Sequence, residues 1–180
     1  MSLSDKEIAS ILSNITVLVD TREQKNEHLI EYFKENKIPY QIEKLETADY
    51  TFILPNFPEL GMDKKILVEK KNSLDEISGN FAKDRERFTR EFERITDEKI
   101  HLVIENATWK KLMGHSYRSM LSPRSFLASL LTWNIRYNCP IWFVGKEESP
   151  MLIYHIMYYE LFEFLKQKRL TEILRSDIID

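Results

Sequence analysis

The sequence predicts an α/β protein in which a mixed central sheet is flanked by helices. Short runs of β-branched and apolar residues, too short for helices, alternate with longer segments whose apolar residues recur at helical spacing. The predicted order is β-α-β-β-β-α-β-α-β-α, without internal repeats or low-complexity segments. With 180 residues, the chain is long enough for one well-buried core, so we expect one main domain.

The domain organisation is predicted from the two ends of the chain. Ser4 and Glu7 have the spacing of a capping box, which indicates a short N-terminal helix. We therefore expect a helical appendage over residues 1–14, the main domain over residues 15–165, and a helical tail over residues 166–180.

A buried strand and a helix are predicted to open the main domain. Residues 16–20 form a β-branched apolar run that is too short for a helix and ends in Asp20. A helix follows and ends before the proline at position 39. Its apolar face is formed by Leu29, Ile30 and Phe33.

Three further strands are predicted in the next stretch of the chain. Residues 40–45 alternate between apolar and polar side chains, residues 50–54 are again strand-like, and residues 66–71 begin with an apolar run. Proline, asparagine and glycine in residues 55–61 are typical of a turn. We expect these strands to form a meander.

The second half is predicted to alternate helices and strands. A long charged helix comes first, and its apolar face is formed by Phe81, Phe88, Phe92 and Ile95. A strand over residues 101–105, a helix beginning at Ser122 and Pro123, and a strand over residues 141–144 follow. Residues 150–164 are apolar almost all round, which predicts a helix buried on more than one side, in the core or at a subunit contact.

Composition and charge narrow the class of protein. The formal net charge is −3, so any contact with DNA must be local. No apolar run is long enough to cross a membrane, and the N-terminus has no signal-peptide layout. The single cysteine excludes an internal disulfide, and the four histidines lack zinc-ligand spacing. We expect a cytoplasmic protein.

Charged side chains at the end of the strand over residues 66–71 suggest an active site. Side chains alternate along a strand with a rise of about 3.3 Å per residue, so Glu69 and Lys71 point the same way roughly 7 Å apart. Lys70 points to the opposite face. If Asp49 lies beside this strand, two carboxylates and an ammonium group share one spot.

Such a carboxylate pair favours a cation. Two carboxylates about 4 Å apart repel by about 4 kcal/mol at an effective dielectric of about 20. A divalent cation such as Mg²⁺, held by one or two carboxylates, relieves this repulsion and supports phosphodiester hydrolysis. The alternative is that the charges only protect an exposed strand edge from aggregation.

Three short motifs in order resemble the nuclease domain of XPF-type structure-specific endonucleases. Val-Asp-Thr-Arg-Glu stands at residues 19–23, Ala-Asp-Tyr at residues 48–50, and Val-Glu-Lys-Lys at residues 68–71, followed by Asp75. The family patterns are Val-Asp-x-Arg-Glu, Gly-Asp-Tyr and Glu-Arg-Lys-x-x-x-Asp. The resemblance covers about residues 15–165. It implies a restriction-endonuclease-like PD-(D/E)xK fold and divalent-metal cleavage of branched DNA.

The resemblance assigns roles to individual positions. Asp49 and Glu69 match the ligands of a Mg²⁺ or Mn²⁺ ion, and Lys71 matches the catalytic lysine. Supporting acidic positions fall on Asp20, Glu23 and Asp75. The candidates for contact with DNA are Arg22, Lys70 and Arg87.

Two positions depart from the family pattern. Ala48 replaces a glycine, and alanine tolerates a positive φ poorly, so the backbone entering Asp49 has an ordinary conformation or carries strain. Lys70 replaces an arginine and loses its bidentate fork. Neither change removes a predicted metal ligand.

Several candidates also have ordinary structural interpretations. Asp20 and Asp75 are in positions to cap the following helices. Arg22 pairs with Glu23 or solvent in one alternative, and the arginines near Arg87 form a solvated helix face in another. Glu105 either joins the acidic cluster, caps a helix or lies at the surface. The three tryptophans are expected in the core.

Three functional hypotheses follow. The first is an active endonuclease of DNA repair or recombination, acting on flap, fork or nicked duplex DNA. The second is a non-catalytic member of the same fold that binds DNA or partners a nuclease. The third is a restriction-type or junction-resolving enzyme that shares only the metal site. A stand-alone domain of this kind would suit a bacterial or phage-derived nuclease, or a subunit recruited by another protein. A homodimer or a recruiting protein would supply DNA affinity.

Overall fold

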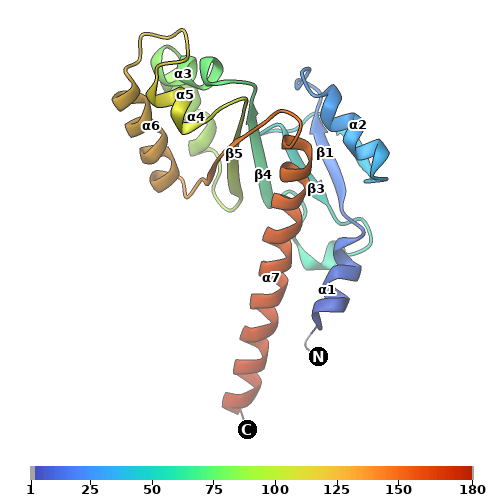
Figure 1. Cartoon of the computed structure of the whole chain (residues 1–180). Helices are drawn as coiled ribbons and strands as arrows, with labels where there is room; N and C mark the ends of the chain where they lie inside the picture. The colour runs from blue at the N-terminus through green and yellow to red at the C-terminus, as the bar shows by residue number, and fades with distance from the viewer. Residues whose placement is uncertain (1–2, 180) are drawn as a thin grey trace.

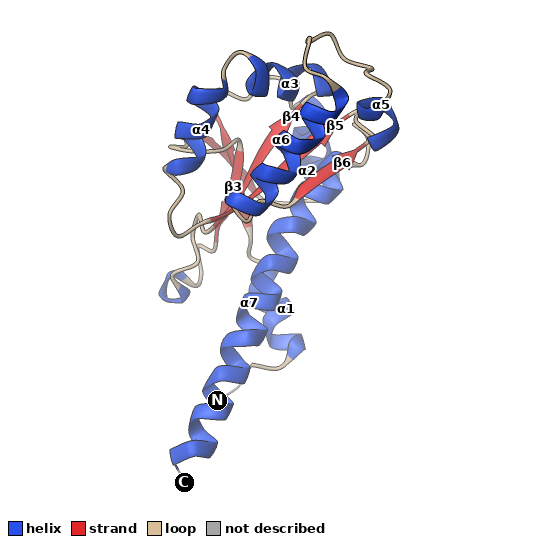
Figure 2. Cartoon of the chain, turned by 90° about the vertical axis from the view of Figure 1, so that its left-hand side faces the viewer, coloured by secondary structure: helices blue, strands red, loops and turns tan. Residues whose placement is uncertain are grey.

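The computed structural model describes the backbone of residues 3–179 and the side chains of residues 3–167. Figure 1 shows a central sheet with α3, α4, α5 and α6 on one face and α2 and α7 on the other. Figure 2 is viewed from the first of these sides and shows α4 and α6 in front of the strands. The predicted α/β architecture with a mixed sheet is confirmed.

Six strands form the sheet in the order β2-β1-β3-β4-β5-β6. Their bounds are β1 (Thr16–Asp20), β2 (Tyr40–Glu43), β3 (Tyr50–Ile53), β4 (Ile66–Lys71), β5 (Lys99–Glu105) and β6 (Ile141–Val144). Strand β3 is antiparallel to β1 and β4, and the other neighbours are parallel. All six predicted strands are present.

The predicted meander is wrong at its first strand. Strand β2 pairs with β1 in parallel, with Val17 opposite Tyr40, and does not contact β3 as a ladder partner. Helix α2 provides the crossover that a parallel pair requires. Only β3 and β4 form the expected antiparallel pair, where Tyr50 lies opposite Val68.

Seven α-helices lie among the described residues. Their bounds are α1 (Asp5–Leu12), α2 (Glu27–Glu35), α3 (Leu74–Ala82), α4 (Arg85–Glu93), α5 (Trp109–Met113), α6 (Pro123–Arg136) and α7 (Ser149–Ile179), and a short 3-10 turn spans Pro58–Leu60. The capping box of Ser4 and Glu7 begins α1, and Ser122 caps α6 just before Pro123, both as predicted.

The long charged helix predicted around Phe81 and Phe88 is two helices. The chain bends between α3 and α4, and the rings of Phe81 and Phe88 lie 5.7 Å apart. On one straight helix, residues seven apart would be separated by about 10 Å along the axis. The bend brings both rings to Trp133, at centroid distances of 5.0 and 5.3 Å.

Two hydrophobic cores cover the two faces of the sheet. The core on the α2 and α7 side includes Ile8 and Leu12, so α1 is packed into the main fold. Helix α7 contacts α1, α2, β4 and β5, which is the predicted burial on more than one side, although Tyr159 remains exposed. The boundaries at residues 14/15 and 165/166 stay predictions.

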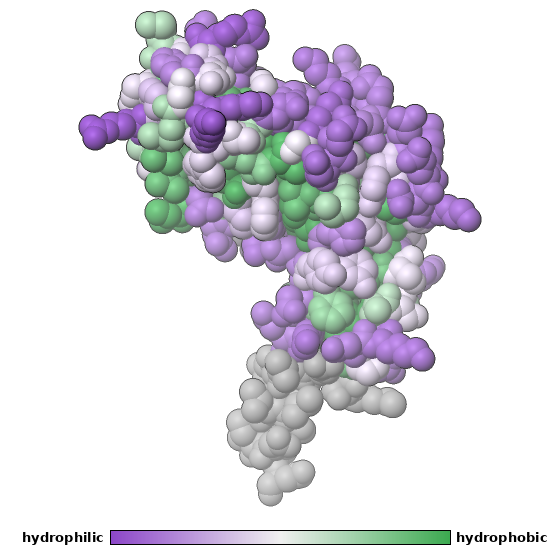
Figure 3. Space-filling view, viewed as in Figure 1, coloured by the Kyte–Doolittle hydropathy of each residue, from purple (hydrophilic) through white to green (hydrophobic). Residues whose placement is uncertain are grey.

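The second core is built around Trp133, which is fully buried as predicted. The same prediction is wrong for Trp109 and Trp142, which are both exposed. Figure 3 shows apolar surface along the edge where α6 lies, and Leu131 and Ile135 of that helix are exposed. Among the described residues, no helix has the length and apolar character needed to cross a bilayer.

Candidate active site

Strand β4 sends its side chains alternately to the two faces of the sheet. Leu67 belongs to the core beneath α3, α4 and α6, whereas Val68 belongs to the core beneath α2 and α7. Glu69 and Lys71 therefore share the first face, and Lys70 points to the second, as the alternation predicts. Charged residues that are neighbours in the sequence of β4 therefore lie on opposite faces of the sheet.

Backbone hydrogen bonds fix Asp49 between β1 and β4. Its N–H donates to the carbonyl of Val68 at 3.1 Å, and its carbonyl accepts from the N–H of Asp20 at 2.8 Å. The side-chain Oδ2 accepts from the backbone N–H of Lys70 at 2.8 Å. Ala48, just before it, has a φ of 64°. An alanine therefore adopts a left-handed conformation at the position where the family pattern has glycine, the residue that adopts it most easily.

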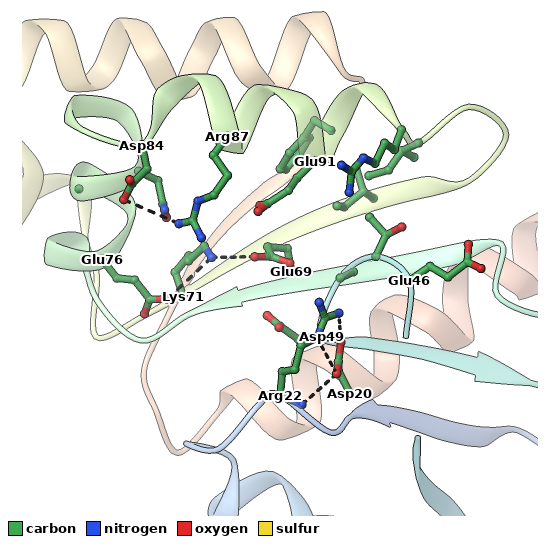
Figure 4. Close-up of a pocket in the computed structure, with 18 of the residues that line it drawn as sticks. Asp20, Arg22, Glu46, Asp49, Glu69, Lys71, Glu76, Asp84, Arg87 and Glu91 are labelled. Atoms are coloured by element: carbon green, nitrogen blue, oxygen red, sulfur yellow. Dashed lines mark hydrogen bonds and ion pairs between the residues drawn. The ribbon is translucent and has the colours of Figure 1, made fainter. Parts of the chain in front are cut away.

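These elements surround a cleft of about 630 Å³ (Figure 4), into which Asp49, Glu69 and Lys71 point. Lys71 Nζ lies 2.7 Å from Glu69 Oε1. Asp49 approaches from the loop before β3, on the opposite side of Glu69 from α3. Other charged residues lining the cleft are Asp20, Arg22, Glu46, Asp75, Glu76, Asp84, Arg87, Glu91 and Arg94.

Burial dominates the electrostatics of this cluster. It raises the pKa of Asp49 well above its usual value, and the nearby Glu69 raises it further. Burial also raises the pKa of Glu69, although Lys71 partly opposes the shift. For Lys71, burial alone would lower the pKa, but Glu69 and Asp49 outweigh it and raise the pKa. These carboxylates therefore favour the charged ammonium form of Lys71.

The carboxylate pair fits a hard divalent cation. Mg²⁺ is commonly held by one or two carboxylates, with waters completing its octahedral shell. Asp49 and Glu69 are two carboxylates whose burial disfavours their charged forms, so a bound cation would stabilise both. Within residues 3–167, no group of three acidic, histidine or cysteine side chains forms a ready cage. Waters and a phosphate oxygen would have to complete the shell.

Asp20 and Arg22 form the wall of the cleft below Asp49. The Arg22 guanidinium makes an ion pair with Asp20 and donates to the carbonyl of Leu45 at 2.8 Å. Burial would raise the pKa of Asp20, but its hydrogen bonds from Arg22 lower it overall. The backbone N–H of Arg22 donates to Asp20 Oδ1 at 2.9 Å, so Asp20 closes a turn instead of capping α2.

Asp75 is at the rim of the cleft, on the first turn of α3. Its carboxylate accepts from the backbone N–H of Arg118 at 2.5 Å and from the side-chain Nε at 3.1 Å, which ties down the loop before α6. Ser73 caps α3 by accepting from the N–H of Glu76, so Asp75 is not the cap. The structure therefore places Asp75 in a loop-holding position.

Lys70 and Glu23 lie on the other face of the sheet, outside the cleft. The Lys70 side chain is 0% exposed, and its Nζ lies 3.4 Å from Glu23 and 3.9 Å from Glu105. A buried ammonium cannot reach a DNA phosphate, so the predicted DNA contact of Lys70 does not fit the structure. Glu23 is likewise committed to this ion pair.

Glu105 completes what we call the opposite-face cluster, formed by Glu23, His28, Lys70, Glu105 and Ser149. Glu105 Oε1 accepts from the Ser149 hydroxyl at 2.5 Å and lies 2.7 Å from His28 Nε2. It therefore joins a cluster, but not the acidic cluster of the cleft, and it ties β5 to α2 and to the first turn of α7. Sequence spacing gives no signal for His28 or Ser149, because both contacts join distant segments.

Arg87, like Arg22, is a predicted DNA-binding residue that the structure places at the cleft. It is 62% exposed and lies 3.7 Å from Asp84, its neighbour one turn earlier. The ordinary pair between Arg90 and Glu86, at 4.0 Å, is present as well. Arg87 is therefore free enough to turn toward a phosphate, while its exposed partner restrains it only weakly.

The sheet and the charged cleft beside β4 define an XPF-type nuclease domain. The chain belongs to the ERCC4 domain family, whose model matches residues 19–156. The structure is similar to that of XPF from Aeropyrum pernix, with a TM-score of 0.60, 17% identity, and coverage of 81% of this chain and 61% of that chain. The predicted family and fold are thereby confirmed.

A second similar structure is XPF from Aeropyrum pernix in complex with DNA. The TM-score is 0.58 at 18% identity, with coverage of 80% of this chain and 63% of that chain. This chain therefore spans about three fifths of the length of these two structures. No curated protein sequence matches the chain.

Proposed function

We propose that this chain is a divalent-metal-dependent DNA endonuclease domain that hydrolyses phosphodiester bonds in branched DNA. One observation carries the proposal: Asp49 and Glu69 share a cleft with the Lys71 ammonium in an ERCC4 domain. The retained pair of carboxylates and the retained lysine favour an active enzyme over a non-catalytic subunit of the same fold.

Each residue of the cleft has a distinct role in this proposal. Asp49 and Glu69 would hold a Mg²⁺ or Mn²⁺ ion, which supplies acidification of bound water and charge neutralisation at phosphorus. The Asp49 carboxylate is aimed by the N–H of Lys70, so its direction is preset. Lys71 carries a positive charge, so it neutralises charge on the phosphate or orients the attacking water.

DNA contact in this proposal is local and begins at the cleft. Arg87 lies on one wall, and Arg22 forms part of the other beside Asp20. With a net charge of −3, the chain cannot rely on a general positive field, so an additional module, a second copy or a recruiting protein would raise the affinity. The solved complex of a similar XPF protein with DNA supports DNA as the substrate class.

The proposed activity is tested by comparing wild type with Asp49→Ala and Glu69→Ala. Substrates are flap, fork, nicked and linear duplex DNA, each with Mg²⁺, Mn²⁺ or EDTA. We expect cleavage of branched DNA only with metal and a loss of roughly 10³-fold or more in each variant, because each removes a ligand.

The matched control is Glu35→Ala, which removes an exposed carboxylate from α2, on the face of the sheet away from α3 and α4. It should cleave like wild type. Cleavage in EDTA, or equal cleavage by Asp49→Ala, would contradict the mechanism. Metal-saturated protein that binds DNA without cutting any substrate would favour the non-catalytic alternative.

A further inference from the structure

Three groups surround the Lys71 ammonium. Glu69 Oε1 lies 2.7 Å from Nζ, Glu76 Oε1 lies 3.7 Å from it, and the Phe88 ring lies beneath it at 5.5 Å to the centroid. The Lys71 side chain is only 10% exposed, and Phe88 is fixed in the core. Lys71 therefore has few positions available, and two carboxylates compete for it (Figure 4).

Glu76 is held in place independently of Lys71. Its Oε2 accepts from the backbone N–H of Asn72 at 2.9 Å and from the Asn72 side-chain amide at 3.0 Å. These contacts, aided by the turn from β4 into α3, leave Oε1 facing Lys71 (Figure 4). Glu76 is thus a positioned carboxylate, although it lies outside the sequence motifs of the family.

If the proposed function is right, Glu69 cannot bind the cation and keep its short ion pair with Lys71 at the same time. As a metal ligand it must direct its oxygens to the cation, and it then gives up the short ion pair with Lys71. An ammonium that is mostly buried and loses its partner is strongly destabilised. Asp49 cannot replace Glu69, because it is the other predicted ligand.

We propose that Glu76 is a positioning residue that holds Lys71 when Glu69 turns to a divalent cation. The inference rests on the proposed function for the presence of the cation. Without Glu76, Lys71 stays on Glu69 and competes with cation binding. With Glu76, Lys71 moves by a short side-chain rotation over the Phe88 ring and remains beside the cleft.

The test measures cation binding by titration calorimetry with MnCl₂ and with MgCl₂, using the full chain without DNA. We expect Glu76→Gln to weaken binding by about tenfold, the lower end of the roughly 10–100-fold losses that follow removal of a group supporting a metal site, because Glu76 acts through Lys71. The matched control is Glu91→Gln. Glu91 lines the same cleft and its charge also acts on Glu69, but its carboxylate makes no ion pair with Lys71 among the described contacts.

A double-mutant cycle separates the effect of the ion pair between Glu76 and Lys71 from the general effect of a negative charge in the cleft. Lys71→Ala should bind the cation more tightly than wild type, because it removes the ammonium that competes with the cation for Glu69. In the Lys71→Ala background, Glu76→Gln should weaken cation binding by no more than Glu91→Gln does. Equal losses in Glu76→Gln and Glu91→Gln, or a tenfold loss that persists in the Lys71→Ala background, would overturn the inference. So would a folded wild type that binds no cation. Coupled cation binding without DNA cleavage would uphold the inference while rejecting the proposed function.

Discussion

The two faces of β4 carry charged clusters of opposite character. In the opposite-face cluster, Lys70 is enclosed by Glu23 and Glu105, and Glu105 has two further partners. In the cleft, burial raises the pKa of both Asp49 and Glu69, so their charges are incompletely compensated. The contrast indicates that one face of the strand stabilises the fold, while the other holds carboxylates that a cation can stabilise.

The largest expected effect is on the opposite face, in Lys70→Met. Removing the ammonium leaves Glu23 and Glu105 without their cation, so we expect a loss of about 3–5 kcal/mol in the free energy of unfolding. Urea unfolding measures it. Lys64→Met is the matched control, because Lys64 pairs with Glu43 at the surface and should lose less than about 1 kcal/mol. Equal losses of unfolding free energy in the two variants would show that the buried and the exposed ion pairs contribute equally to stability.

A smaller loss is expected in Ser149→Ala. The Ser149 hydroxyl is buried and donates to Glu105, so its removal costs about 2 kcal/mol of stability. Ser13→Ala, which removes an exposed hydroxyl, should change stability by less than about 0.5 kcal/mol. Thermal and urea unfolding should agree. A neutral Ser149→Ala would mean that Glu105 is already satisfied by His28 and Lys70.

In the cleft, Asp49→Asn should stabilise the protein by about 1 kcal/mol at neutral pH in EDTA. The folded pKa of Asp49 is raised, so the folded state binds more protons than the unfolded chain, and stability falls as pH rises from about 4 through the folded pKa. Asparagine does not titrate and keeps the acceptor for the Lys70 N–H.

The pH dependence checks the cause of this gain. Urea unfolding between about pH 4 and pH 8 should show the advantage of Asp49→Asn shrinking as pH falls toward the unfolded pKa of about 4. Adding Mn²⁺ should stabilise wild type and not the variant. An advantage that is the same at every pH would show that Asp49 carries no electrostatic cost.

Much of the fold could be predicted from the sequence, because the periodicities of strands and helices are local. The six strands and the helix beginning at Pro123 follow from such patterns. Strand order does not, since it depends on which segments meet in space, and β2 pairs with β1 instead of β3. The bend between Phe81 and Phe88 also escapes local patterns, because both rings pack against Trp133 on a helix distant in sequence.

The site divides in the same way. Alternation along β4 predicts that Glu69 and Lys71 face one side and Lys70 the other, and the structure has this arrangement. The partners of Lys70 could not be predicted, because Glu105 and the residues that hold it are far apart in the chain. Glu76 did leave a signal, since Ser73 and Glu76 have capping-box spacing at the start of α3, but the direction of its carboxylate depends on the fold.

The smallest expected effect is in Ala48→Gly, at the residue before Asp49. Relief of the positive φ should gain about 1–2 kcal/mol, whereas the loss of a buried methyl group and the greater freedom of unfolded glycine together cost about as much. We therefore expect a net change below about 0.5 kcal/mol, which would explain how alanine is tolerated there.

Ala48→Val is the sharper probe. A β-branched residue at this φ should destabilise the protein by about 2 kcal/mol or more in urea unfolding, because valine is far less compatible with the left-handed conformation. A neutral Ala48→Val would mean that the backbone leading into Asp49 is relaxed, so that no strain is held next to the cleft.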